Sequence, residues 1–175
     1  MDLNVNVYKY VKYEKCDNGN KIVESYSKAR LPIRKHANDS GADAFVCFSD
    51  QSKEDYIVIS PGTVRRVPLG IAIDIPEGYE IQIRPRSGST SNGQISVFGT
   101  VDNDYKGMLM ANVANISKDP YLVRNGDRLC QLVISPVYKC DFTKMWDETI
   151  ENDLGKSIDV ENSDRGENGF GSTGK

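Results

Sequence analysis

Histidine, tryptophan and paired cysteines are all scarce in this sequence. Its 175 residues include one histidine, one tryptophan and four widely spaced cysteines that form no CxxC pair. His36 alone cannot complete a zinc site with such cysteines, so we expect free thiols in a reducing compartment and a cytoplasmic protein. His36 also lies in a polar stretch typical of a surface or structural histidine, so we expect a hydrolytic reaction in this chain to use a carboxylate as its general base, with His36 as the alternative.

Long apolar runs and an excess of positive charge are also absent. No window approaches the roughly 18 apolar residues that a membrane span needs, and the N-terminus lacks the basic start and apolar run of a signal peptide. The net charge of −3 argues against sequence-independent binding of nucleic acid, which needs clustered Lys and Arg. We therefore expect neither stable nucleic-acid binding nor a membrane partner.

No segment shows a sustained helical periodicity, whereas short apolar or alternating runs separated by turn signals recur along the chain. Many short strands with this spacing predict an all-β sandwich or barrel. The ranges expected as strands are 3–8, 21–26, 56–59, 64–75 as one longer strand, 80–84, 95–98, 108–116, 128–134 and 137–142, the last closing the sheet region. In 40–46 we expect a tight approach around Asp43 and then a strand over the apolar residues that follow it. Residues 89–94 are expected to be a polar connection.

The stretch Gly99–Gly107 reads as the tip of a hairpin, since β-compatible sequence flanks it on both sides. It carries two carboxylates and a tyrosine, and Asp102 is the candidate general base. Asn and Asp are also ordinary turn residues, so an acidic turn without catalytic function stays open at this point.

Three further stretches have the parts of an anion site. In Pro85–Gly88, a hydroxyl and an arginine adjoin a glycine that allows close backbone approach, although a plain turn that ends a strand would look the same. Gly126–Leu132 places Arg128 and Gln131 in an apolar strand, where they need structural partners or a ligand. Beyond Trp146 the chain is acidic, and 165–175 is either a phosphate cradle or a disordered terminus.

These stretches together resemble the five motifs of the homotrimeric deoxyuridine triphosphate nucleotidohydrolase (dUTPase) family. The matching residues are 40–43, 85–88, 99–107, 126–132 and 165–174. The resemblance implies a distorted β-jelly-roll or barrel core at 1–145 with an inserted hairpin at about 9–30, a mobile acidic arm at 146–164 and a glycine-rich C-terminal lid at 165–175. It also implies a homotrimer with shared active sites that uses Mg²⁺ to hydrolyse dUTP to dUMP and pyrophosphate. That reaction keeps uracil out of DNA and supplies dUMP for thymidylate synthesis.

The resemblance also implies a role for each matching residue. Asp102 would activate the water that attacks the α-phosphorus, and Asp43 would support the water shell of the metal or orient Arg86. The residues implied to bind substrate are Arg86, Ser87, Gly88 and Gln131 for the phosphates, Ser96, Gly99, Thr100 and Val101 for the base edge, Tyr105 for the deoxyribose, Met110 for the pocket wall, and Arg165, Phe170, Gly171 and Ser172 for the lid.

The sequence departs from the family pattern in two places near the base and the pocket. Ser96 replaces an asparagine found in some members, and the link from Gly88 to Asp102 is shorter than is usual in the family. Two alternative functions stay open. One alternative is the related dCTP deaminase family, whose acid–base glutamate would fall at Asn112. The other is a nucleotide-gated regulator that contacts a protein partner through residues 9–30.

Overall fold

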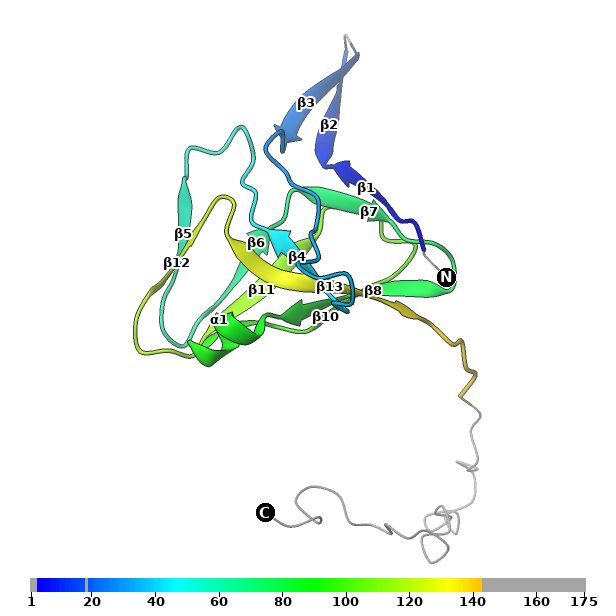
Figure 1. Cartoon of the computed structure of the whole chain (residues 1–175). Coiled ribbons are helices and arrows are strands. Elements are labelled where there is room, and N and C mark those ends of the chain that lie inside the picture. The colour runs from blue at the N-terminus through cyan, green and yellow to red at the C-terminus, as the bar shows by residue number, and fades with distance from the viewer. Residues whose placement is uncertain (1–2, 18, 143–175) are drawn as a thin grey trace, which may run out of the picture. The chain divides into compact units, whose positions relative to one another are not determined.

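The structure, a computed structural model, describes residues 3–17 and 19–142 (Figure 1). The chain divides after Tyr138, and every strand described lies in the first unit. All strand pairings within the described residues are antiparallel, and the prediction of an all-β chain is confirmed. The predicted acidic arm and C-terminal lid lie outside the described residues.

The largest sheet has four strands in the order β10-β8-β13-β4. Its members are β4 (Ala42–Phe45), β8 (Tyr79–Pro85), β10 (Gly99–Val101) and β13 (Arg128–Pro136). Ile81 and Ile83 of β8 alternate inward and are buried, which is the period-two pattern of a strand with one core face. This sheet therefore brings the segments with residues 40–43, 85–88 and 126–132 together.

A second sheet has three strands in the order β6-β11-β9. Its members are β6 (Val64–Pro68), β9 (Gln94–Ser96) and β11 (Met110–Asn115). Along β11, Ala111 and Val113 are buried, whereas Asn112 is exposed. The outer face of this sheet thus carries Met110 and Asn112.

Three two-stranded pairs complete the architecture. They are β1 (Asn6–Lys9) with β7 (Ile71–Asp74), β5 (Tyr56–Ile59) with β12 (Tyr121–Arg124), and β2 (Val11–Cys16) with β3 (Gly19–Ser25). The β2–β3 hairpin projects beyond the other strands and is mostly exposed (Figure 1). Asp50 holds its base, because the Ser25 and Ser27 hydroxyls donate to the Asp50 carboxylate at 2.8 and 2.7 Å.

The core is aliphatic and continuous between the two larger sheets. Its buried members are Ala44, Val46, Ile59, Val67, Leu69, Ile71, Ile73, Ile75, Ile81, Ile83, Val101, Leu109, Ala111, Val113, Val123, Leu129, Cys130 and Leu132. All four cysteines are unpaired. Burial raises the pKa of the Cys130 thiol to about 12, so this side chain acts as a small apolar group rather than a nucleophile.

The single strand predicted over 64–75 is wrong. The chain forms β6 and β7 instead, with Leu69 and Gly70 between them. Gly70 has a φ of +68°, which breaks the strand. A Cβ at this position would lie 2.7 Å from Cys47 Cβ, so close packing also requires glycine there.

Other local predictions also need correction. The polar connection expected at 89–94 contains a helical turn, α1 (Ser87–Ser91), in which the Thr90 and Ser91 hydroxyls donate back to the carbonyls of Arg86 and Ser87. Gly99–Val101 is a strand rather than part of a hairpin tip, since it pairs with β8. The strand expected at 3–8 lies at Asn6–Lys9, and β12 was not predicted. The strand expected at 137–142 is absent, because these described residues form no strand.

Within the described residues, no helix is both long enough and apolar enough to span a membrane.

Asn115 is a buried polar anchor in the second sheet. Its Nδ2 donates to the carbonyls of Ile59 and Asp119, both at 2.8 Å, and its Oδ1 accepts from Ser117 N at 3.0 Å. Asn115→Ala should lower the free energy of unfolding by about 3 kcal/mol, because it leaves the buried Ile59 carbonyl without this donor. The exposed neighbour on the same strand gives the matched control: Asn112→Ala should change it by less than about 0.5 kcal/mol in urea titrations. Equal effects of the two substitutions would contradict this assignment.

Candidate active site

Asp43 in β4 joins two arginines that come from different strands. Arg86 follows β8, and its Nε donates to Asp43 Oδ1 at 2.8 Å while its Nη2 donates to Oδ2 at 3.3 Å. Arg128, the first residue of β13, donates from Nη1 to Asp43 Oδ2 at 3.3 Å. The Asp43 and Arg86 side chains are only 22% and 24% exposed, so solvent screens this pair less than a surface ion pair. Two forked contacts fix the direction of the Arg86 guanidinium.

Gln131 lies beside this ion cluster and explains why residue 41 is glycine. Gln131 Nε2 donates to the Pro85 carbonyl at 2.8 Å, which ties β13 to the end of β8. A Cβ on Gly41 would lie 2.3 Å from Gln131 Oε1. Gly88 in α1 has open space around it, with no heavy atom of another segment within 4 Å of its Cβ position. Residues 41, 43, 86, 88 and 131 thus belong to one locality of the first sheet.

The turn that follows Asp102 is held by its own residues and by β7. Tyr105 N donates to the Asp102 carbonyl at 3.1 Å, and Tyr105 Oη donates to the Met108 carbonyl at 2.9 Å. Lys106 Nζ donates to Asp74 Oδ1 at 2.6 Å and to the Asn103 carbonyl at 2.9 Å. These contacts fix the backbone that follows Asp102.

Asp102 lines a hollow of about 300 Å³. The other residues around it are Arg66, Ile83, Gly99, Thr100, Val101, Tyr105, Met108, Leu109, Met110 and Asn112. The structure therefore brings together Asp102, Tyr105, Met110 and the segment Gly99–Val101. Sequence reasoning missed Arg66 as a member of this hollow, because only the register of β6 against β11 reveals that it lies opposite Asn112.

Ser96 does not present its side chain to this hollow. It is 2% exposed, and its Oγ donates to the Leu129 carbonyl at 3.0 Å. The hydroxyl is therefore committed to the core, and Ser96 is not among the residues that line the hollow.

The Asp43 cluster borders a different hollow, of about 500 Å³. Its lining residues are Arg30, Ile33, Lys35, Asp43, Phe45, Gly126, Asp127 and Arg128. The Arg30 guanidinium lies 4.0 Å from the centroid of the Phe45 ring, where a cation and an aromatic face attract each other. This hollow shares no lining residue with the hollow of Asp102. Neither of these two hollows therefore contains both Asp102 and Asp43.

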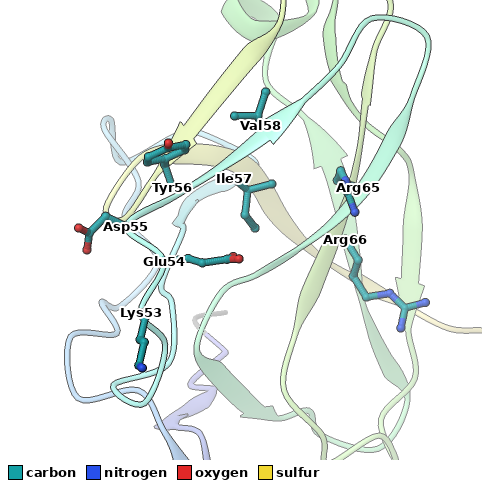
Figure 2. Close-up of a pocket in the computed structure, with 8 residues that line it drawn as sticks. All are labelled: Lys53, Glu54, Asp55, Tyr56, Ile57, Val58, Arg65 and Arg66. Atoms are coloured by element: carbon teal, nitrogen blue, oxygen red, sulfur yellow. The ribbon is translucent and has the colours of Figure 1, made fainter.

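A third hollow, of about 610 Å³, contains none of the residues predicted for the site. Figure 2 shows its lining residues, Lys53, Glu54, Asp55, Tyr56, Ile57, Val58, Arg65 and Arg66. The four residues predicted for the lid, Arg165, Phe170, Gly171 and Ser172, lie outside the described residues.

Comparisons with known proteins agree on one family. Residues 34–174 match the family model described as dUTPase. Deoxyuridine 5′-triphosphate nucleotidohydrolase from Syntrophotalea carbinolica is 36% identical to this chain, and the match covers 88% of this chain and 95% of the relative. The enzyme of the same name from Anaplasma marginale is also 36% identical, and that match covers 88% of this chain and 97% of the relative. The solved structure of the Staphylococcus bacteriophage 80alpha dUTPase with dUPNHPP covers 98% of this chain and 99% of its own, at 25% identity and a TM-score of 0.65. Such neighbours have a jelly-roll fold, as predicted for this chain. The chain belongs to the dUTPase family.

Proposed function

We propose that this chain hydrolyses dUTP to dUMP and pyrophosphate. The observation that carries the proposal is the hollow in which Asp102, Tyr105 and the Gly99–Val101 segment lie together. It is supported by curated relatives of 36% identity that are named for this reaction. The reaction would keep uracil out of DNA and supply dUMP for thymidylate synthesis.

Asp102 is the general base of the proposed reaction. Its carboxylate takes a proton from water as the water oxygen forms a bond to the α-phosphorus, and the bond from that phosphorus to the pyrophosphate oxygen breaks. Pyrophosphate leaves with the electron pair of the broken bond. Because the turn around Asp102 is held by Lys106 and Tyr105, the carboxylate needs little reorganisation for this step.

The phosphates are assigned to Arg86, Ser87, Gly88 and Gln131. Asp43 orients the Arg86 guanidinium through its two hydrogen bonds, and the space around Gly88 permits close approach of an anion. Tyr105 packs against the deoxyribose and leaves no room for a 2′-hydroxyl, while the backbone of Ser96, Gly99, Thr100 and Val101 reads the base edge and Met110 forms a wall.

Mg²⁺ fits this chain as a partner of the substrate. Within residues 3–17 and 19–142 no three His, Cys, Asp or Glu side chains gather as a metal site. Magnesium usually keeps several waters and binds one or two carboxylates together with substrate phosphates, so such a cluster is not required. When bound, the ion neutralises phosphate charge. Asp43 reaches its water shell only indirectly, since both carboxylate oxygens already accept from arginines.

A homotrimer with shared sites is proposed as the active assembly. Asp102 and the Asp43 cluster border separate hollows within one copy, which supports a site in which a neighbouring copy supplies one of the two groups. In the cyclic arrangement of a trimer, each copy can give its Asp102 hollow to one site and its Arg86 cluster to the next.

The glycine-rich segment 165–175 is assigned as a lid over the bound nucleotide. Arg165 suits phosphate through its forked donors, and Phe170 offers a flat face to the base. Gly171 and Ser172 would add backbone and hydroxyl donors. Such closure would exclude bulk water from the reaction.

The β2–β3 hairpin is the proposed contact for a protein partner. Tyr13 and Ile22 face each other across it and are 58% and 50% exposed, and such exposed apolar pairs are common at interaction surfaces. A cytoplasmic location is proposed on the basis of the four unpaired cysteines.

The purified chain should release pyrophosphate from dUTP, and a chelator of divalent cations should suppress the reaction. The same assay with dCTP, dTTP and UTP should show turnover at least about 100-fold lower, because the hollow must hydrogen-bond the base edge and exclude the 2′-hydroxyl. Ammonia release from dCTP would instead support the deaminase alternative, and an inert protein would refute the proposal.

Asp102→Asn should lower kcat by about 1,000-fold while dUTP still binds, because the amide keeps the shape but cannot accept the proton. Asp104→Asn is the matched control, since Asp104 lies in the same turn but does not line the hollow. It should keep kcat within about threefold of the wild-type value. Stopped-flow measurement of pyrophosphate release gives both numbers, and near-normal turnover by Asp102→Asn would exclude it as the base.

Mixed assemblies test whether the site is shared. Asp102→Asn and Arg86→Gln chains should each be nearly inactive alone, but unfolding and refolding them together should restore about a quarter of wild-type activity, because one site in four then has both native side chains. Each variant refolded alone is the control. No recovery in mixtures that contain mixed trimers would place both residues in a site made by a single copy.

A further inference from the structure

The Asp102 turn, residues 102–109, is anchored by its backbone at both ends. Val101 of β10, which directly precedes Asp102, pairs with β8. At the other end, the Leu109 N–H donates to the Ile71 carbonyl at 2.8 Å. The middle of the turn lies between these two anchors and forms no strand, so its position depends on other contacts.

Hydrogen bonds within the turn set its shape. Tyr105 N donates to the Asp102 carbonyl at 3.1 Å, and Tyr105 Oη donates to the Met108 carbonyl at 2.9 Å. Lys106 Nζ donates to the Asn103 carbonyl at 2.9 Å. Bonds of this kind make the turn compact, but they do not hold it in one place relative to the sheets.

A side-chain contact links the middle of the turn to a neighbouring strand. Lys106 Nζ donates to Asp74 Oδ1 at 2.6 Å. Asp74 is the last residue of β7, which pairs with β1 and buries Ile71 and Ile73 in the core. The pair of Asp74 and Lys106 therefore ties the turn to a strand that is itself fixed in the fold.

The proposed reaction needs a carboxylate that is fixed in direction as well as in position. The direction of the Asp102 side chain depends on the backbone on both sides of it, and β10 fixes only the preceding side. A misplacement of about 1 Å can lower a catalysed rate by about 100-fold. We propose that Asp74 and Lys106 are positioning residues, which hold the turn so that the Asp102 carboxylate meets the attacking water. This role rests on the proposed hydrolysis of dUTP and deepens it.

The exposure of the pair separates a role in turnover from a role in stability. The Lys106 and Asp74 side chains are 58% and 53% exposed. Exposed ion pairs add little to the stability of a fold, so loss of this pair should leave the chain folded. Its effect should appear where a small displacement matters, which is the step that Asp102 carries out.

A direct contact with a substrate phosphate is the alternative role for Lys106. An ammonium group has three donors, and Asp74 and Asn103 accept from Lys106. Loss of a phosphate ligand would raise KM and the Kd of a substrate analogue. Loss of a positioning residue would lower kcat and leave binding nearly unchanged.

The test compares turnover, binding and local opening of the turn in variants of the pair. Asp74→Ala and Lys106→Met remove the contact, whereas Asp74→Glu and Lys106→Arg keep both charges. Lys118→Met is the control, because Lys118 is an exposed lysine in the bend that follows β11. The measurements are kcat and KM for dUTP, the Kd of its α,β-imido analogue, and hydrogen exchange of the Tyr105 amide in the chain without nucleotide.

Asp74→Ala and Lys106→Met should each lower kcat about tenfold, while KM and the Kd of the analogue stay within about twofold. The Tyr105 amide should exchange faster in both variants. In the Lys106→Met chain, Asp74→Ala should cause no further loss, because Asp74 acts through Lys106. Asp74→Glu and Lys106→Arg should keep most of the turnover, and Lys118→Met should leave it unchanged.

A higher KM and a weaker Kd in Lys106→Met, with a normal kcat, would show a phosphate contact and overturn the positioning role. Normal kcat in both Asp74→Ala and Lys106→Met would overturn it as well. A wild-type chain that leaves dUTP intact would instead refute the proposed function. Hydrogen exchange is measured without substrate, so unchanged exchange of the Tyr105 amide in the two variants would refute the tie between Lys106 and Asp74 independently of activity.

Discussion

The ion pairs of the Asp43 carboxylate fix the position of Arg86, the proposed phosphate ligand. The carboxylate accepts from Arg86 and Arg128 at once and so joins the segment after β8 to the first residue of β13. Because Asp43 and Arg86 are largely shielded from solvent, removal of Asp43 would leave the Arg86 guanidinium without its counter-charge. Gln131 adds a second tie between the same strands, and Gly41 is small because Gln131 fills the space in front of it. Strand pairing alone brings these segments together, and the shared carboxylate then sets the direction of Arg86.

The Asp102 side of the molecule is built from different parts. A turn after β10 carries Asp102, the proposed base, and the rigidity of this turn comes from Tyr105 and from the contact of Lys106 with Asp74 of β7. The two sides border separate hollows, and this separation constrains any mechanism. The proposed shared site would bring a water activated at Asp102 of one copy to a phosphate oriented by Arg86 of another. Assembly and chemistry would then depend on each other.

The sequence predicted most of the strands, because alternation and turn residues are local signals. It also grouped Asp102, Tyr105 and Met110, which the structure brings to one hollow. Its failures were long-range. Nothing local shows that Gly70 meets Cys47, that Gly99–Val101 pairs with β8, or that Ser96 bonds the Leu129 carbonyl. The roles of the individual site residues stay predictions.

The inward turn of Ser96 has a consequence for how a base can be read. A hydroxyl that bonds a buried carbonyl stabilises the core but is lost to a ligand, so selectivity must come from the backbone or from another strand. The register of β6 against β11 sets Arg66 beside Asn112 on the wall of the Asp102 hollow. Hydrogen bonds between the paired strands hold these two residues in place, so their position does not depend on the short link between Gly88 and Asp102.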